Sequence, residues 1–240
     1  MKYVLDTHSH TIASGHAYNT IAEMAKAASK KGLELLAITE HSKMMPGSCQ
    51  DIYFSNLSKV EREQYGVKLW MGVELNIMDY EGNIDMPERI LKNMELVIAS
   101  LHTPCIKPGN IEENTSAVIG AMKNPYIHII GHLDDAGYPV DYEKIVQTAK
   151  ETGTILEVNN NSLSPDCFRA NSRNLDAKMM KLCMDYEVPV VVGSDAHAAH
   201  LVGSHEYAYS LMKEIGFPKE LVLNRSVDML KKAMKSKKNK

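Results

Sequence analysis

"DTHSHTIASGH", Asp6–His16, follows directly on the apolar run "YVL" and holds three of the ten histidines of the chain. A short apolar run that stops at a cluster of polar residues is typical of a buried strand that leads into a functional loop. Neutral imidazole is among the ligands that zinc, manganese and iron prefer. The stretch therefore predicts a strand with a candidate metal site at its carboxyl end.

The same arrangement recurs, because short apolar runs alternate with longer amphipathic segments along the chain. We predict strands near residues 2–6, 33–40, 67–75, 94–100, 126–131, 153–159 and 188–193. We predict helices near residues 19–32, 55–66, 112–123, 141–152, 173–187, 204–215 and 226–235, and a hairpin over 76–86. Nearly every strand is continuously apolar, which is typical of parallel strands buried on both faces. The pattern predicts an α/β fold, and 240 residues is close to the size of one α/β barrel.

The chain shows no linker rich in Pro, Gly or Ser and no shift in composition that would divide it. We therefore expect one domain over residues 1–240. Its lysine-rich end, residues 230–240, is expected to be a solvated tail that frays.

Polar side chains stand at the carboxyl end of each predicted strand, about 30 residues apart, as in barrels of this kind. Because parallel strands all point the same way, these side chains are expected to meet on the face where α/β barrels carry their active sites. The histidine and acidic candidates are His8, His10, His16, His41, Glu74, His102, His132, Asp195 and His197. Nine donors exceed what one four-coordinate ion can use, so two or three ions are predicted, with Glu74 bridging a pair.

Any single histidine is more often a core or surface residue than a ligand. Placement changes this expectation, because seven of the ten histidines lie at strand ends or in the first loop. The other three are expected not to bind metal: His128, His200 and His205. Asn159 or Asn160 is expected to bond substrate, ligands or strand-end backbone. Asp6 is expected either to orient a ligand or to bond a nearby helix or loop.

Composition excludes several classes of partner. Lys and Arg number 27 against 30 Asp and Glu, and the net charge of −3 provides no basic field for a long nucleic acid. No stretch approaches the length of a membrane span, and Asp6 interrupts the first apolar run before it could form a signal peptide. The four cysteines lie far apart, as expected of reduced thiols in a cytoplasmic protein.

Seven short stretches occur in an order that is characteristic of one protein family. They are "DTHSHTIASGHAY", "AITEH", "GVELNI", "IASLH", "HIIGH", "LEVNNNS" and "VVVGSDAH". From about Tyr3 to Leu230 the chain resembles the PHP (polymerase and histidinol phosphatase) superfamily, most of all its YcdX-type phosphatase branch. The resemblance implies a distorted (β/α)7 barrel similar to a TIM barrel, with a trinuclear site at the carboxyl ends of the strands. It implies three divalent ions per chain, zinc first, with manganese or iron as alternatives.

The resemblance also implies how the nine donors divide among three ions. One ion would be held by His8, His10, Glu74 and Asp195. A second would share Glu74 and add His102 and His132, and a third would take His16, His41 and His197. The chain departs from the family at Glu40, where an Asp is usual, and "LDDAGYPVD" after His132 lacks the expected "PGNP"-like loop.

These observations predict a metal-dependent hydrolase of small phosphate monoesters, in which a metal-bound hydroxide attacks phosphorus. Glu74, Asp195 and Glu40 are the expected catalytic residues, and the acid that protonates the leaving alkoxide is either Glu40 or water. Substrate contacts are expected from Asn160, Lys43 and Arg169. The alternatives are a histidinol-phosphate phosphatase, a 3′–5′ exonuclease or nucleotidase, an amidohydrolase, and a metal-binding protein without turnover.

Overall fold

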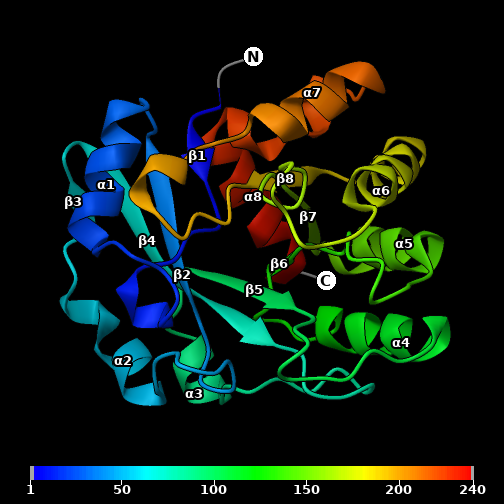
Figure 1. Cartoon of the computed structure of the whole chain (residues 1–240), viewed down its shortest axis with the longest axis horizontal. Helices are drawn as coiled ribbons and strands as arrows, with labels where there is room; N and C mark the ends of the chain where they lie inside the picture. Colours follow the sequence, from blue (N-terminus) through cyan, green and yellow to red (C-terminus); the bar gives the residue numbers. More distant parts are fainter. Residues whose placement is uncertain (1–2, 239–240) are drawn as a thin grey trace.

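A nearly closed barrel of parallel strands lies at the centre of the structure, a computed structural model that describes residues 3–238 (Figure 1). The strand order is β1-β2-β4-β5-β6-β7-β8, and β3 pairs antiparallel with β4 outside this order. The strands are β1 Leu5–Asp6, β2 Leu35–His41, β3 Glu63–Gln64, β4 Val67–Asn76, β5 Leu96–Ser100, β6 Ile129–Ile130, β7 Ile155–Asn159 and β8 Val190–Gly193. The seven parallel strands confirm the predicted α/β barrel.

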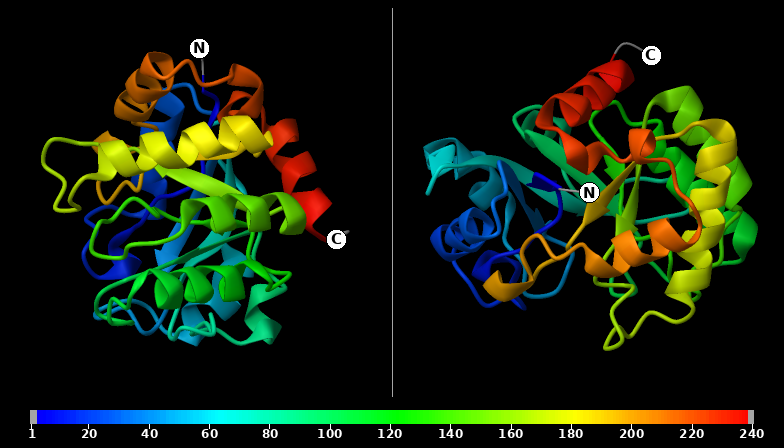
Figure 2. Two further views of the ribbon diagram at one scale, coloured as in Figure 1. Left: turned by 90° about the vertical axis from the view of Figure 1, so that its right-hand side faces the viewer. Right: turned by 90° about the horizontal axis from the view of Figure 1, so that it is seen from above.

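Helices cover the outside of the barrel, and α8 crosses its amino-terminal end (Figure 2). The α-helices are α1 Ile21–Lys30, α2 Asp51–Asn56, α3 Glu88–Leu91, α4 Ile111–Met122, α5 Tyr142–Thr152, α6 Ser172–Tyr186, α7 Glu206–Glu214 and α8 Val227–Lys238. The 3-10 helices are η1 Ile12–Ser14, η2 Leu57–Lys59, η3 Ala199–Leu201, η4 Lys219–Leu221 and η5 Leu223–Arg225. At the start of α1, Thr20 and Glu23 form a capping box, as the sequence pattern indicates.

The barrel interior is apolar at its amino-terminal end and polar at its carboxyl end. Leu35 of β2 and Ile155 of β7 pack there with Leu230 of α8 in one buried cluster. Side chains of a strand alternate between its faces, so the inward positions of β7 run from Ile155 through Glu157 to Asn159. Within the five residues of β7, the inward side chains thus change from an aliphatic one to a carboxylate and an amide. The polar side chains therefore meet inside the barrel at its carboxyl end.

Side chains join β1 to β8 where the barrel closes. The Asn224 amide accepts from Val192 N at 2.7 Å and donates to Val192 O at 2.8 Å and to Leu5 O at 3.1 Å. Asp6 accepts from the backbone N of Ser194 at 3.0 Å and from its Oγ at 2.5 Å. Of the two roles expected for Asp6, the structure therefore shows bonding to a nearby loop.

The prediction of a helix near residues 55–66 is wrong, because helical structure ends at Lys59. The chain leaves helical structure after η2 and forms the short strand β3 instead. Tyr65 and Gly66 have φ values of 53° and 75°, and this turn brings β3 back onto β4. Arg62 Nη1 donates to Leu57 O at 2.8 Å, which satisfies a carbonyl at the helix end. The two-residue turn at Tyr65 and Gly66 makes β3 and β4 a tight hairpin, which outweighs the helical pattern.

The hairpin predicted over 76–86 is present. Ile77 and Ile84 form an antiparallel bridge, and Met78 N donates to Asn83 O at 2.8 Å. Gly82 adopts a φ of 84° at the turn, and a Cβ there would overlap the backbone of α4. The hairpin is therefore fixed against α4 by a close approach that requires glycine.

The tail expected to fray is ordered over most of its length, since residues 230–238 belong to α8. Lys237 Nζ donates to Met122 O at 2.7 Å and to Thr154 Oγ1 at 2.6 Å. These buried acceptors hold the last turn of α8, so the expectation of fraying is wrong here. Residues 239 and 240 lie outside the described residues.

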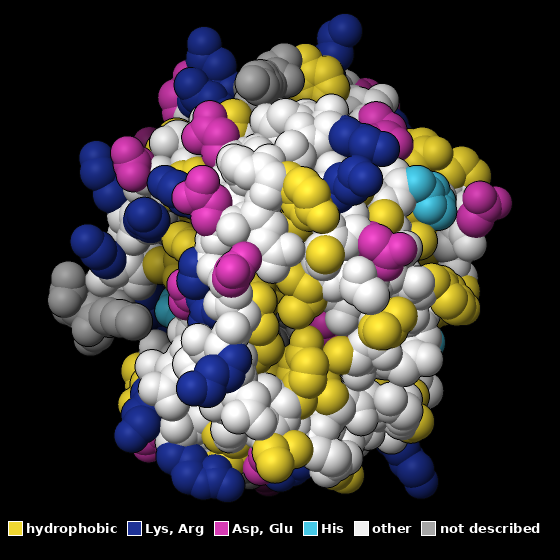
Figure 3. All heavy atoms as spheres, turned by 90° about the vertical axis from the view of Figure 1, so that its left-hand side faces the viewer, with side chains coloured by type: hydrophobic (Ala, Val, Ile, Leu, Met, Phe, Trp, Pro, Cys, Tyr) yellow, Lys and Arg dark blue, Asp and Glu magenta, His cyan; other side chains and the backbone are white. Residues whose placement is uncertain are grey.

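The protein surface carries charges of both signs. On the face that Figure 3 shows, basic and acidic side chains are interspersed, consistent with the small net charge of −3. Within residues 3–238, no helix combines the length and the apolar character that crossing a membrane requires.

Candidate metal centre

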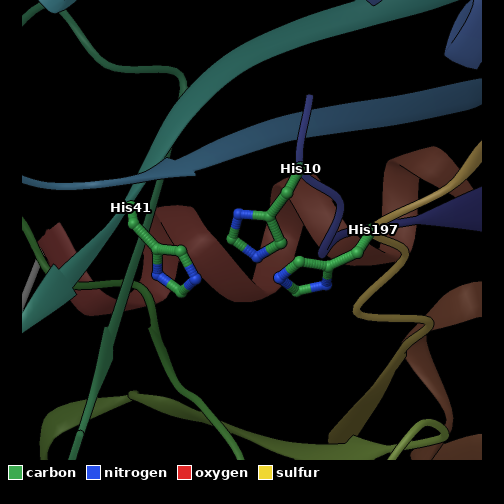
Figure 4. A group of neighbouring side chains, drawn as sticks. All are labelled: His10, His41 and His197. Carbon is green, nitrogen blue, oxygen red and sulfur yellow. The ribbon is translucent and has the colours of Figure 1, made fainter. Parts of the chain in front are cut away.

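All nine predicted metal ligands lie together at the carboxyl ends of the strands. They are His8, His10, His16, His41, Glu74, His102, His132, Asp195 and His197. Seven are buried, whereas His16 is exposed and His197 is partly exposed. The rings of His10, His41 and His197, from three separate segments, face one another (Figure 4). The predicted convergence is confirmed, while the ions that these side chains bind stay a prediction.

Four of these residues bring their donor atoms close together. Nε2 of His8 and Nε2 of His10 lie 3.1 Å apart. Oε2 of Glu74 lies 3.4 and 3.5 Å from these two nitrogens, and Oδ1 of Asp195 lies 3.6 and 3.4 Å from them. A zinc ion bonded to four donors at about 2.0–2.1 Å would separate them by about 3.3–3.4 Å. Five donor separations in this set are therefore close to those around one divalent ion.

The remaining candidates form two further groups around this set. Oε1 of Glu74 lies 3.0 Å from His132 Nε2 and 3.3 Å from His102 Nε2, so Glu74 turns one oxygen to each group. This is the arrangement expected of a carboxylate that bridges two ions. Nearer the surface, Nε2 of His197 lies 3.0 Å from Nε2 of His16.

Two donor atoms of the cluster are buried and make no hydrogen bond with any described residue: Nδ1 of His41 and Oε2 of Glu74. They lie 2.7 Å apart, but their alignment is not that of a hydrogen bond. A buried polar atom without a partner costs about 1–3 kcal/mol. Orphaned imidazole and carboxylate atoms in one cluster are therefore well suited to a bound cation.

The charges of three candidate ligands favour cation binding, whereas Glu157 and Glu74 outweigh the effect of burial and raise the pKa of His8 well above its usual value. Burial alone would raise the pKa of Glu74, but the neighbouring His8 and His41 hold it well below its usual range. Asp195 is likewise buried, and His8 and His10 keep its pKa well below the ordinary value. Burial and the nearby His41 lower the pKa of His10 well below its usual range. Charged carboxylates and a neutral imidazole are the forms that bind metal.

A buried carboxylate that the sequence analysis did not select lies behind His8. Glu157 of β7 is 1% exposed, and its Oε1 lies 2.7 Å from His8 Nδ1. Its Oε2 accepts from His132 N at 3.0 Å and from Asn159 Nδ2 at 3.1 Å. A carboxylate in this position fixes the tautomer and orientation of a metal-binding histidine. Its signal in the sequence is a charge inside the apolar strand "ILEVN".

Other polar side chains orient the cluster in the same way. Asn76 Oδ1 lies 2.7 Å from His102 Nδ1, and Ser100 Oγ donates to Glu74 Oε1 at 2.7 Å. Asn159 Nδ2 lies 3.2 Å from an oxygen of Asp195, so Asn159 bonds a candidate ligand, one of its expected roles.

Gly193 at the end of β8 makes room for this support. A Cβ at Gly193 would overlap Oε1 of Glu157 and lie 2.8 Å from Cβ of His8. The close contact between Glu157 and His8 therefore depends on a residue without a side chain.

Two candidate ligands have backbone conformations that few side chains adopt. The φ angle is 22° at His132 and 50° at Asp195, two residues beyond the ends of β6 and β8. Such conformations cost on the order of 1–3 kcal/mol and persist where the surrounding structure imposes them. Here they accompany side chains that reach the cluster.

Glu40 does not lie in the cluster. His41 faces the barrel interior, and the adjacent Glu40 therefore faces outward. Oε2 of Glu40 accepts from Ser14 Oγ at 2.6 Å and from Thr11 N at 3.0 Å. Ser14 Oγ lies 3.1 Å from His10 Nδ1, so Glu40 contacts His10 through Ser14. The position is that of a residue that orients His10, and it does not favour the expected direct catalytic contact.

A cavity of about 470 Å³ opens from the cluster to the surface. Arg169, from the loop between β7 and α6, lines its wall with a side chain that is 9% exposed. Its Nη1 donates to Ser162 Oγ at 2.7 Å and lies 3.7 Å from Asp195 Oδ2. A fixed guanidinium beside candidate metal ligands is suited to a phosphate group.

The two other expected substrate residues have different places. Lys43 Nζ lies 3.2 Å from Asp51 Oδ1. Asn160 Oδ1 accepts from the first N–H groups of α7, including Tyr207 N at 3.0 Å, and so caps that helix. Neither is among the described residues that line the cavity, whereas the adjacent Asn161 is.

Residues 6–161 match the PHP domain, and seven of the nine candidate ligands lie within the match. The chain belongs to the PHP domain family. This PHP protein is 44% identical over 237 residues to a probable phosphatase of Clostridium novyi (strain NT), over 99% of this chain and 96% of that protein. It is 47% identical over 241 residues to a probable phosphatase of Thermoanaerobacter sp. (strain X514), over 100% and 98% of the two chains. The resemblance to PHP phosphatases is confirmed.

Solved structures share the barrel of this PHP protein. The histidinol phosphate phosphatase of Lactococcus lactis, complexed with zinc, L-histidinol and phosphate, has a TM-score of 0.60 at 16% identity, over 90% of this chain and 95% of that one. A putative histidinol phosphatase of Listeria monocytogenes has a TM-score of 0.63 at 17% identity, over 85% and 99% of the chains. At these identities the likeness concerns the fold, and the predicted distorted barrel is confirmed.

Proposed function

We propose that this PHP protein is a metal-dependent phosphatase of small phosphate monoesters. The observation that carries the proposal is the meeting of nine candidate metal ligands, seven of which line a cavity of about 470 Å³, with one buried guanidinium. Cations and an arginine together complement the charge of a phosphate dianion, and the cavity has the size of a small-molecule site. The probable phosphatases of Clostridium novyi and Thermoanaerobacter support the same class of reaction.

The proposal includes three divalent ions, with the ligands divided as the family resemblance implies. The groups of three close donors in the described residues agree with this division in part: His8, His10 and Glu74 form one group, whereas His41 lies in a group with Glu74 and His102 and in another with His10 and His197. The first ion takes His8, His10, Glu74 and Asp195; the second takes Glu74, His102 and His132; the third takes His16, His41 and His197. Zinc is the first choice, because imidazole and carboxylate suit it and the Lactococcus lactis protein is described with zinc. Manganese and iron are the alternatives. Such ions, when bound, acidify water and neutralise charge on phosphate oxygens.

The protein side chains supply binding and orientation. Arg169 uses one N–H group on Ser162 and has further N–H groups of its planar fork to bind a phosphate. Glu157 holds His8 in one orientation, and Glu40 acts on His10 through Ser14. Because Glu40 lies outside the cavity lining, we propose that water protonates the leaving alkoxide.

The alternatives differ in substrate size and in the bond that is cleaved. The described cavity lining contains one lysine or arginine, Arg169, which does not favour a long nucleic acid. The structures of histidinol phosphatases share the fold, so L-histidinol phosphate belongs in any substrate panel. The expectations of one domain and of a cytoplasmic location stay predictions.

Elemental analysis combined with a substrate panel tests the proposal. The full chain, purified without chelator, is expected to hold two or more divalent ions. It is expected to hydrolyse monoesters, to lose activity in a chelator and to regain it with zinc or manganese. Glu74→Ala should abolish turnover while thermal unfolding stays cooperative, and Glu88→Ala, which changes an exposed carboxylate, serves as control. Fewer than two ions, or cleavage of diesters and amides but not of monoesters, would overturn the proposal.

A further inference from the structure

Phe168 has the highest exposure among the large hydrophobic side chains in residues 3–238, at 86%. It precedes Arg169 in the loop between β7 and α6, and its ring centroid lies 5.4 Å from the guanidinium carbon of Arg169. Arg169 is fixed by its hydrogen bond to Ser162. The loop therefore presents an open aromatic ring directly beside the guanidinium that we propose binds phosphate.

Phe168 belongs to an apolar part of the cavity wall. Met45, Leu101 and Pro104, which follow β2 and β5, line the same cavity. Met45 is 9% exposed, so its side chain is already covered by protein, whereas the ring of Phe168 is open. A molecule bound in the cavity can remove apolar surface of Phe168 from water, and this burial favours binding.

The charges of the wall limit what such a molecule can carry. Outside the nine candidate ligands, the described lining holds one cation, Arg169, and one carboxylate, Asp135. Asp135 Oδ1 accepts from Gly137 N at 2.8 Å. If Arg169 binds the transferred phosphate, this lining provides no further lysine or arginine for a second anionic group. The wall therefore does not favour a leaving group that carries a second anionic charge.

We infer that Phe168 is a specificity-determining residue, and that the preferred substrates are phosphate monoesters with an uncharged aromatic or apolar group close to the phosphate. The inference rests on the proposed phosphatase function. Phe168 and Arg169 lie side by side, so a phosphate on the guanidinium brings the neighbouring part of the substrate onto the ring. Two aromatic rings attract each other with centroids about 4.5–7 Å apart.

A kinetic comparison of benzyl phosphate with ethyl phosphate tests the inference on the metal-loaded full chain. Both leaving groups are primary alcohols, so the comparison isolates the ring. We expect kcat/KM to favour benzyl phosphate by about 3- to 10-fold. This factor corresponds to the free energy of one aromatic pair together with the burial of its apolar surface. Phe168→Ala should bring this ratio close to one, and Phe168→Tyr should retain it. Tyr65→Ala, a change in an exposed ring at the amino-terminal end of β4, should also retain it.

A binding measurement separates this inference from the proposed function. Benzylphosphonate and ethylphosphonate cannot be hydrolysed, so calorimetry compares their Kd values whether or not the protein turns over monoesters. If no monoester is hydrolysed, the proposed function fails, while a Phe168-dependent preference for benzylphosphonate still supports the aromatic subsite. Equal benzyl-to-ethyl ratios in the native protein and in Phe168→Ala, in binding or in kinetics, would overturn the inference.

Discussion

Glu157→Gln replaces one oxygen of a buried side chain by an NH2 group with almost no change in volume. Oε2 of Glu157 accepts from two donors, His132 N at 3.0 Å and Asn159 Nδ2 at 3.1 Å, whereas Oε1 faces His8 Nδ1 at 2.7 Å. The new amide is expected to keep its oxygen at the Oε2 position, because an NH2 group there would face two N–H donors. Its NH2 group then points at His8.

This contact changes the tautomer of His8. An NH2 group can only donate to Nδ1, so the imidazole must carry its proton on Nε2. Nε2 is the atom that lies 3.1 Å from His10 Nε2 and 3.4 Å from Glu74 Oε2, in the proposed first metal site. A protonated nitrogen cannot bind a cation, so the set loses a donor. Changes behind a metal-binding histidine typically cost about 10- to 100-fold in metal affinity, which is about 1.4–2.7 kcal/mol.

Competition titration with a chromophoric chelator measures this loss on metal-free protein. We expect Glu157→Gln to bind its tightest zinc ion about 10- to 100-fold more weakly than the native chain. Glu88→Gln is the matched control, because Glu88 is exposed and bonds Tyr126 OH at 2.7 Å. Thermal unfolding of the metal-free proteins verifies that the variants fold. Unchanged zinc affinity in a folded Glu157→Gln protein would refute the tautomer argument.

Three further changes test the support of the site and the closure of the barrel. Gly193→Ala is expected to weaken zinc binding at least about tenfold, because the new Cβ would overlap Glu157 and crowd His8; a native titration curve would contradict this. Asn224→Ala is expected to lower the free energy of unfolding in urea by about 2–4 kcal/mol, because buried backbone groups lose three hydrogen bonds. A loss below about 1 kcal/mol would argue against closure by this amide. Burial lowers the pKa of Lys237 from 10.5 to about 8, so the unfolded chain binds more protons between these pH values. The native protein should therefore gain stability relative to Lys237→Met as pH rises through this window, and parallel curves of unfolding free energy against pH would disprove it.

Much of the site could be predicted because parallel topology makes strand ends meet. His8, Glu74 and Asp195 are far apart in the chain, yet each stands within two residues of the carboxyl end of a parallel strand. Apolar runs, capping residues and glycines are local signals, and they located the strands and most helices. The order of the strand-end residues was therefore enough to predict which donors gather.

Where two adjacent residues of a strand are both polar, the sequence did not show which of their side chains points into the barrel. Asn159 bonds Asp195 inside the barrel, whereas Asn160 caps α7. Glu40 and His41 likewise face opposite sides of β2, and one position along a strand is enough to exchange these roles. The helix predicted near 55–66 was also wrong, because Tyr65 and Gly66 form a two-residue turn that pairs this segment with β4.

The sequence by itself determined the alternation of strands and helices, and with it the face on which the histidines and carboxylates collect, because burial periodicity and strand direction are properties of short segments. Only the tertiary structure decided the partners within that face. Glu157 supports His8 across 149 positions of chain, and Asn160 caps α7 across 47 positions. Such pairs depend on how distant segments pack against each other, and no local pattern carries that information.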